Sequence, residues 1–287
     1  MIVRTSDLDS WINEVDSRGG IRSEESIDLR ANFLLEFNTH VNTNLHPFSD
    51  EYFNQMLSLY KEISAKDVNQ YSNEHTQFSF EQSLNGPNPY GSGDIRFVSQ
   101  HVHAASRIIK MLDLPAEAEL CDLGSGWGLT SEVFSFCGAK VTAVDINKDF
   151  VELNNQRFKK FGYNSIAIHS SFDDIDIDKK FDALVFYECL HHAIKPWETI
   201  ANVKKLLKNN GGKIAIAGEP INTNWWPHWG LRLDAESIYV MRKFGWFESG
   251  WSKEFIIECF NMNGLNTICY DNLSSDPGDI VIIAVQE

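Results

Sequence analysis

The sequence is short of positive charge and of long apolar runs. Its 25 lysines and arginines against 40 acidic residues give a formal net charge of −15. An acidic surface repels the phosphates of nucleic acids and anionic lipids, so we expect neither as a partner. No stretch approaches the roughly 18 apolar residues of a membrane span, and residues 1–17 lack the apolar core of a signal peptide. These absences favour a cytoplasmic protein without membrane insertion.

Regular cysteine spacing and metal-ligand clusters are also missing. The five cysteines are widely spaced and mostly lie in apolar runs, which is typical of reduced, buried thiols. Histidines pair at residues 101 and 103 and at residues 191 and 192, with no acid or cysteine at a ligand-like spacing. The sequence therefore predicts no disulfide framework and no metal.

The pattern of apolar and polar residues changes near residue 95. Before it, apolar residues recur at helical spacing over 8–15, 27–41 and 52–63. A polar, turn-rich segment follows at 71–94, and it is either a plain linker or a lid. We therefore expect residues 1–95 to form a mainly helical N-terminal extension that ends in a lid-like segment.

From residue 96 the pattern alternates strands with helices. Two strands without a helix between them, at 265–270 and 279–285, come last. Regular alternation predicts a mostly parallel sheet covered on both faces, and the final pair predicts an antiparallel last strand. Residues 96–287 are thus expected to form one Rossmann-like α/β domain.

The most informative stretch is ELCDLGSGWG, where a hydrophobic strand runs directly into Gly124, Gly126 and Gly128. Glycines allow a tight turn and the close approach of a ligand to the backbone. Leu129 occupies the place where a dinucleotide-binding loop usually has its third glycine, which disfavours an NAD-dependent dehydrogenase. Asp122, two residues before the first glycine, would repel a pyrophosphate but can accept hydrogen bonds from an ammonium.

A second acid, Asp145, closes the next predicted strand. A carboxylate at this position can accept hydrogen bonds from both hydroxyls of a ribose. Together with Asp122, it suits a ligand that has a ribose and a cationic amino acid but no phosphate. S-adenosyl-L-methionine fits that description.

Four strings resemble, in order, the motifs of class I S-adenosylmethionine-dependent methyltransferases. They are DLGSGWG, AVDIN, FDALVFYECLHH and LLKNNGGKIAIAGEP, and the resemblance covers about the C-terminal two thirds of the chain. It implies that the methionine part of the cofactor is cradled by Asp122, Gly124, Ser125 and Gly126. It also implies that Asp145 holds the ribose and that Ile146 packs on the adenine.

The same resemblance places the adenine edge at the end of the third strand, where family members often have an acid. This sequence has Ser171 and Phe172 there. The alternatives for reading the adenine edge are then Asp173 or a backbone group.

Candidate catalytic residues follow the fourth predicted strand, at the carboxyl edge of the sheet where ligands gather. They are Glu188, His191 and His192. A histidine, with an ordinary pKa near ~6.5, suits a general base. The alternative for either histidine is a structural tie between the loop and the next helix. Glu188 could hold the cofactor, orient a histidine or line the cleft.

After the fifth strand comes the tryptophan-rich text WWPHWGLRLD, which begins soon after Glu219. Such tryptophans either cover a sheet edge or form a platform for a sugar, with Glu219, Trp229, Arg232 and Asp234 as acceptor contacts. The strings GEPI and WGLRLD, and Glu74-His75-Thr76, resemble methyltransferases associated with surface-polysaccharide biosynthesis. This resemblance implies O-methylation of a sugar or glycan hydroxyl. The alternatives are a natural-product or quinone-type small-molecule methyltransferase and an inactive module that binds the cofactor.

Overall fold

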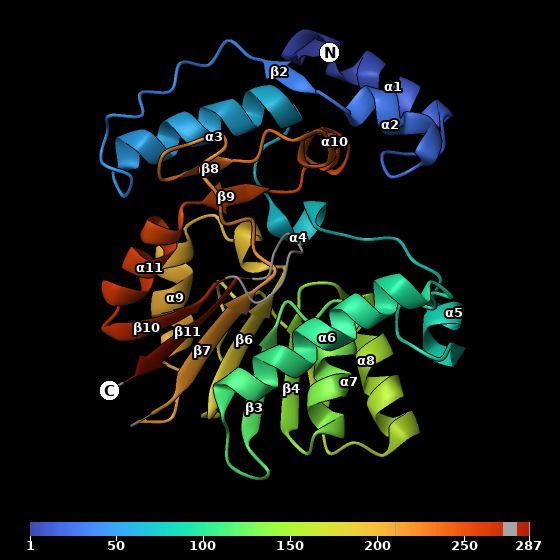
Figure 1. The fold of residues 1–287 in the computed structure, drawn as a ribbon, viewed down its shortest axis with the longest axis vertical. Helices are drawn as coiled ribbons and strands as arrows, with labels where there is room; N and C mark the ends of the chain where they lie inside the picture. Colours follow the sequence, from blue (N-terminus) through green and yellow to red (C-terminus); the bar gives the residue numbers. More distant parts are fainter. Residues whose placement is uncertain (210, 272–279, 287) are drawn as a thin grey trace. The chain divides into compact units, whose positions relative to one another are not determined.

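The computed structural model describes residues 1–209, 211–271 and 280–286. It contains two compact units (Figure 1). Unit 1 consists of Met1–His75 and Pro220–Phe255, and unit 2 of Thr76–Glu219 and Ile256–Glu287. This division differs from the expected boundary at residue 95, because the tryptophan-rich segment joins the N-terminal residues and the segment from residue 76 joins the sheet.

Unit 2 is built on a seven-stranded sheet in the order β10-β11-β7-β6-β3-β4-β5. Its strands are β3 (Glu119–Leu123), β4 (Lys140–Asp145), β5 (Ile166–His169), β6 (Ala183–Tyr187), β7 (Lys213–Ala217), β10 (Leu265–Tyr270) and β11 (Val281–Gln286). The five neighbouring strands β5, β4, β3, β6 and β7 pair in parallel, whereas β11 is antiparallel to both β7 and β10. The predicted Rossmann-like sheet with an antiparallel last strand is therefore confirmed. Asp279, the predicted start of that strand, lies outside the described residues.

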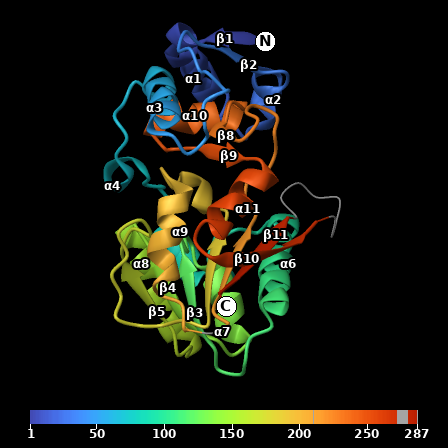
Figure 2. The same ribbon diagram turned by 90° about the vertical axis from the view of Figure 1, so that its left-hand side faces the viewer.

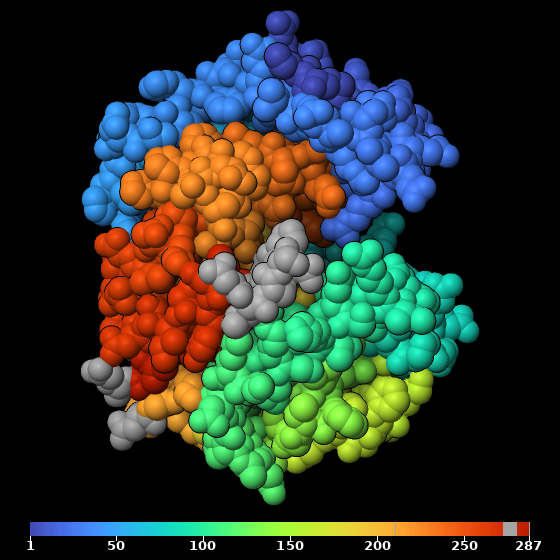
Figure 3. Space-filling view, viewed as in Figure 1, coloured from blue at the N-terminus to red at the C-terminus, as the bar shows by residue number. Residues whose placement is uncertain are grey.

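Helices cover both faces of this sheet. They are α6 (Ile95–Leu112), α7 (Leu129–Phe136), α8 (Lys148–Phe161), α9 (Pro196–Lys204) and α11 (Lys253–Asn261). The short α5 (Phe80–Asn85) packs against α8, and the 3-10 turn η3 (Leu190–His192) follows β6. Right-handed crossovers that step in opposite directions from the centre of the sheet put their helices on opposite faces. Figure 2 shows α6 and α9 on opposite sides of the strands. In Figure 3, the part of unit 2 that precedes α6, residues 76–94, lies on the surface of that unit.

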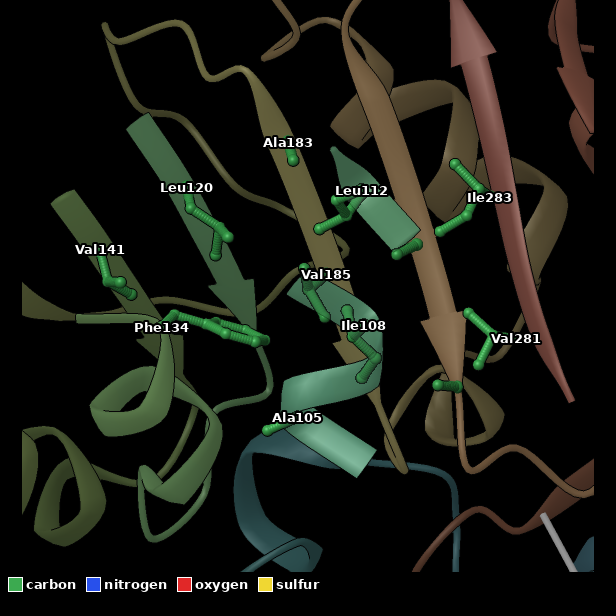
Figure 4. Packing of buried hydrophobic residues seen from close by; sticks show 12 residues of the cluster. Ala105, Ile108, Leu112, Leu120, Phe134, Val141, Ala183, Val185, Val281 and Ile283 are labelled. Carbon is green, nitrogen blue, oxygen red and sulfur yellow. The ribbon is translucent and has the colours of Figure 1, made fainter. Parts of the chain in front are cut away.

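One layer of the core of unit 2 lies between α6, α7 and the sheet (Figure 4). Apolar side chains at helical spacing on α6 meet alternate residues of the strands. The cluster includes Ala105, Ile108, Leu112, Leu120, Phe134, Val141, Val185 and Ile283. Each buried Val, Leu or Ile contributes roughly 1.5–3 kcal/mol by leaving water. The core therefore fixes the strand ends from which the candidate site projects.

Unit 1 combines N-terminal elements with the segment that follows β7. The N-terminal elements are β1 (Ile2–Arg4), η1 (Thr5–Asp7), α1 (Leu8–Ser17), η2 (Glu24–Ser26), α2 (Ile27–Arg30), β2 (Leu34–Glu36), α3 (Asp50–Ser64) and α4 (Gln70–Asn73). The later segment adds β8 (Trp229–Leu231), α10 (Ala235–Phe244) and β9 (Ser249–Trp251). Tyr52 Oη donates to the Trp229 carbonyl at 2.6 Å, and Tyr60 Oη to the Gly245 carbonyl at 2.6 Å. These buried bonds join the two chain segments.

Two of the three helices predicted before residue 95 are confirmed by α1 and α3. The prediction of one helix over 27–41 is wrong. The helix α2 ends at Arg30, and Asn32 has a left-handed φ of 56°, which a continuing α-helix does not allow. Residues 34–36 instead pair in parallel with β1. Within the described residues, no helix is long and apolar enough to span a membrane.

Candidate active site

The loop after β3 leaves an open space at its centre. Gly126 has a φ of 51°, and nothing lies within 4 Å of the position that a Cβ atom would take there. Gly124, by contrast, packs against Cys189, whose Sγ would lie 2.8 Å from a Cβ at that position. The loop is thus closed by protein at one glycine and open at the next. An open backbone surface of this kind suits a ligand that approaches closely.

Asp145, the last residue of β4, lies against this loop. Its two carboxylate oxygens accept from the backbone N–H groups of Gly126 at 2.7 Å and Asn147 at 2.8 Å. Burial raises the pKa of the carboxyl to about 6, although these bonds act in the opposite direction. The predicted ribose acid therefore stands beside the open glycine, at the carboxyl edge of the sheet where ligands bind in such folds.

Asp122 lies one strand away, in β3, and only 1% of its surface is exposed. Its Oδ2 accepts from Thr130 Oγ1 and Ser131 Oγ on α7, both at 2.6 Å. Burial raises the pKa of this carboxyl to about 6 as well. A side chain buried this deeply acts on a cationic ligand more through its charge than through contact. Asp122 also fixes the start of α7.

One side chain of the loop, Ser125, bears on the fit to the predicted cofactor. Ser125 Oγ is buried and has no hydrogen-bond partner among the described residues. A buried hydroxyl without a partner is unfavourable, and a polar ligand that reached it would remove the cost. This hydroxyl, the open space at Gly126 and the two buried acids fit a cationic amino acid joined to a ribose.

The expected adenine end lies beyond β4 and β5. Ile146 is half-buried, and its carbonyl accepts from His169 Nε2 at 2.9 Å. Ser171 Oγ accepts from the backbone N–H of Asp173 at 3.1 Å, while the Asp173 carboxylate accepts from Thr199 on α9. Asp173 thus ties the loop to α9. The ring of Phe172 meets Phe186 edge-on, with centroids 5.6 Å apart, and its Cε1 would lie 3.6 Å from a Cβ at Gly124.

The expected acceptor contact Glu219 instead organises the turn after β6. Its carboxylate accepts from the backbone N–H groups of Cys189, Leu190 and His191 at 2.9–3.1 Å, and it lies 2.8 Å from His191 Nδ1. Burial raises its pKa to about 7, although the backbone hydrogen bonds act to lower it. Because its oxygens are engaged within the turn, Glu219 is a positioning residue. Its contact with the acceptor stays a prediction.

The two histidines of η3 differ in environment. His191 is buried and joined to Glu219, and its ring centroid lies 4.3 Å from that of His192, which is half-buried. A carboxylate on Nδ1 orients an imidazole and fixes its tautomer. The contact with Glu219 gives His191 a structural role, although the partner follows β7 and does not lie on the next helix as predicted; a histidine oriented in this way can also act as a base.

Glu188 adopts a strained backbone conformation at the end of β6. Its φ is 53°, in the left-handed region that is uncommon for residues other than glycine. Gly218 makes room for it, since a Cβ there would lie 2.4 Å from Glu188 Cγ. Its side chain is 47% exposed. Strain of this kind gathers at functional sites, where the fold holds a side chain in an unusual direction.

The remaining predicted acceptor residues lie in unit 1 and have structural roles there. Trp229 has no exposed surface, and its indole N–H donates to the Pro47 carbonyl at 2.7 Å. Arg232 forms ion pairs with Asp234 at 3.1 Å and Glu248 at 3.2 Å. Asp234 also caps α10 by accepting from the Ser237 N–H. A buried indole offers no face on which a sugar could stack, so the burial of Trp229 does not favour the predicted sugar platform.

Several residues of unit 2 near the loop were missed by the sequence analysis. Asn154 on α8 donates to the Gly126 carbonyl at 2.9 Å. Trp127 contacts the rings of Tyr90 and Phe150, and His101 Nδ1 lies 2.8 Å from Tyr187 Oη. The aromatic content of the segment at 71–94 was the available signal for Tyr90. The partners of these residues are distant in sequence, so spacing could not identify them.

Comparison with known proteins agrees with this geometry. Residues 121–213 match the family described as a methyltransferase domain. The ubiquinone biosynthesis O-methyltransferase of Rickettsia conorii is 25% identical over 159 residues, which are 52% of this chain and 54% of that protein. The demethylmenaquinone methyltransferase of Tropheryma whipplei is 28% identical over 118 residues, or 41% and 48% of the two chains. The chain thus spans about half the length of these curated relatives.

Solved structures share the fold. The magnesium protoporphyrin IX methyltransferase of Synechocystis PCC 6803 with bound SAM has a TM-score of 0.52 at 16% identity, covering 76% of this chain and 94% of that one. The 1,6-didemethyltoxoflavin-N1-methyltransferase of Burkholderia thailandensis, with bound 1,6-didemethyltoxoflavin and S-adenosylhomocysteine, has a TM-score of 0.51 at 16% identity, covering 68% and 82%. At these identities the similarity establishes the Rossmann-like class I methyltransferase fold.

Proposed function

We propose that this chain is an S-adenosylmethionine-dependent methyltransferase that acts on a small molecule. The observation that carries the proposal is the open loop at Gly126 between the buried acids Asp122 and Asp145. S-adenosylmethionine would supply an electrophilic methyl group on its sulfonium. Asp145 would bind the ribose hydroxyls, Ser125 and Gly126 the amino-acid part, and Asp122 would balance positive charge. The match of residues 121–213 to a methyltransferase domain supports the same reading.

The acceptor is a small aromatic compound in this proposal, and no longer a glycan. The glycan hypothesis rested on short sequence resemblances and on the tryptophan-rich segment, whose Trp226, Trp229 and Trp251 are buried. The curated relatives bear the names of ubiquinone and demethylmenaquinone methyltransferases. In unit 2, the rings of Tyr90 and Trp127 lie within 5.6 Å of each other beside the glycine loop. Aromatic side chains of this kind suit a flat acceptor ring.

Calorimetry on the purified protein tests the cofactor. We expect binding of S-adenosylmethionine and S-adenosylhomocysteine, and none of NAD, because Asp122 repels a pyrophosphate. Transfer of a labelled methyl group to 4-nitrocatechol, with UDP-glucose as the comparison, then tests the acceptor. Binding of NAD alone would contradict the cofactor assignment. Labelling of UDP-glucose and not of the phenol would restore the glycan reading.

A further inference from the structure

In unit 2, a cluster of polar and aromatic side chains surrounds a histidine that has no role in the function proposed so far. His101 on α6 is its centre, with 14% of its side chain exposed. The rings of Phe97 and Tyr90 lie 4.6 Å and 5.3 Å from the imidazole, centroid to centroid, and Tyr187 meets it edge-on at 5.8 Å. The cluster therefore holds an imidazole in a largely aromatic surrounding.

Tyr187, the last residue of β6, and Glu188, which follows it, both lie near one nitrogen of this ring. His101 Nδ1 lies 2.8 Å from Tyr187 Oη and 3.9 Å from Glu188 Oε2. The negative charge of the carboxylate favours the protonated, cationic ring, in which Nδ1 donates to the phenol oxygen. Glu188 places its carboxylate beside the ring from a backbone with a left-handed φ of 53°.

The cluster adjoins the part of the glycine loop that would hold the methionine end of the cofactor. Tyr90 contacts His101 on one side and Trp127 of the loop on the other, at 5.3 Å and 5.6 Å. Burial raises the pKa of the Tyr90 phenol, and the negative charges of Glu188 and Asp122 raise it further. Cys189, next to Glu188, packs against Gly124. An acceptor bound beside this loop would thus lie close to the imidazole.

We propose that His101 is the general base that takes the proton from the acceptor hydroxyl during methyl transfer. The inference rests on the proposed function and assigns a catalytic residue to it. As the acceptor oxygen bonds to the methyl carbon, its O–H bond breaks and the proton passes to the imidazole of His101. The electron pair of the sulfur–methyl bond stays on sulfur, so the products are a methyl ether, a neutral thioether and an imidazolium. Tyr187 and Glu188 are positioning residues that stabilise this imidazolium.

The test compares His101→Gln with His103→Gln, a matched control two residues along the same helix with an exposed side chain. Methyl transfer to 4-nitrocatechol should fall by about 100-fold or more in His101→Gln, the usual effect of losing a general base. The control should keep the wild-type rate. Both variants should bind S-adenosylhomocysteine within about twofold of the wild type and unfold at its melting temperature.

A second readout does not depend on turnover. In the complex with S-adenosylhomocysteine, below the pKa of the free phenol, the wild type should shift bound 4-nitrocatechol to its coloured phenolate, since His101 accepts the proton. His101→Gln should lack this band, and Tyr187→Phe should weaken it while keeping the ring. A His101→Gln variant with full turnover and a normal band would overturn the proposal, above all if His191→Gln loses both. Wild-type cofactor binding without transfer to any phenol would overturn it as well, whereas failure to bind S-adenosylmethionine removes the proposed function itself.

Discussion

At the scale of single residues, the charges of the site are held in an unfavourable state by burial. Asp122 and Asp145 each have a pKa raised from 3.8 to about 6, with burial as the largest cause. The hydrogen bonds from Thr130, Ser131, Gly126 and Asn147 recover only part of this cost. A ligand that carries an ammonium and ribose hydroxyls would supply what the ionised acids lack.

This leads to a prediction about pH. Affinity for S-adenosylmethionine should rise as the pH increases through about 6, because the carboxylates that receive the ligand become ionised. Asp145→Asn should weaken binding by roughly 10- to 100-fold, the cost of about 1.5–3 kcal/mol for a charged hydrogen bond, and should flatten the pH dependence. Calorimetric titration from pH 5 to pH 8 measures both. Asp149→Asn, at an exposed site on α8, is the matched control; equal pH slopes in all three proteins would rule out the assignment.

The same pKa values set the sign of a stability change in the protein without ligand. The native pKa of each acid is higher than that of the unfolded chain, so unfolding releases protons between about pH 4 and pH 6. The contribution of these two groups to the free energy of unfolding is therefore greatest below about pH 4 and falls as the pH rises through about 6. Each shift corresponds to roughly 3 kcal/mol as an upper figure. Asp145→Asn should remove its share of this fall.

At the scale of elements, the turn from β3 to α7 is fixed by a helix that follows it in the chain. Asn154 on α8 is buried, donates to the carbonyls of Gly126 and Phe150 at 2.9 Å, and lies directly against Gly128. A Cβ at Gly128 would fall 1.5 Å from Asn154 Oδ1. The glycine is therefore required by close packing as well as by its left-handed φ of 88°.

Two glycine variants separate these causes. Gly162 has a φ of 71°, and nothing lies within 4 Å of its Cβ position, so Gly162→Ala carries only the backbone strain, about 1 kcal/mol. Gly128→Ala should cost about 1–3 kcal/mol more through the displacement of Asn154. Urea unfolding measures the difference. Only Gly128→Ala should also weaken the binding of S-adenosylhomocysteine; equal effects of the two variants would show that Asn154 does not hold the loop.

At the scale of the whole molecule, each unit draws on distant parts of the chain. Unit 1 takes its tryptophan-rich segment from residues after β7 and packs it against α3. Trp229 is buried there between Tyr52, Phe53 and Phe255, with ring centroids at 5.4 Å, 6.4 Å and 6.2 Å. The tryptophan-rich segment, which in the sequence resembles a ligand platform, thus contributes Trp229 to the hydrophobic core of unit 1.

Replacing this tryptophan tests its role. Trp229→Ala should lower stability by about 3–5 kcal/mol, as for other large aromatic residues removed from a core. Affinity for S-adenosylhomocysteine should be unchanged, because the residues assigned to it lie in unit 2. Trp225→Ala, in the same segment but half-buried, should cost less. A stable Trp229→Ala protein with reduced acceptor affinity would instead support the sugar platform.

The sequence by itself determined the sheet of unit 2, its antiparallel last strand and the loop between Asp122 and Asp145. These features depend on apolar periodicity and on glycines directly after a strand, and both can be recognised within a short stretch of sequence. Where a local property was misread, as over 27–41, a single residue with left-handed φ ended the helix.

Only the tertiary structure decided which polar side chains meet. His101 and Tyr187 are 86 residues apart, and Glu219 reaches His191 from 28 residues away. The buried indole N–H of Trp229 donates to the carbonyl of Pro47, which lies 182 positions earlier in the chain. Partners of this kind are brought together by the packing of strands and helices, and no spacing along the chain encodes them. The fold could therefore be predicted from local patterns, whereas the roles of Glu219, Trp229 and His101 depended on long-range contacts.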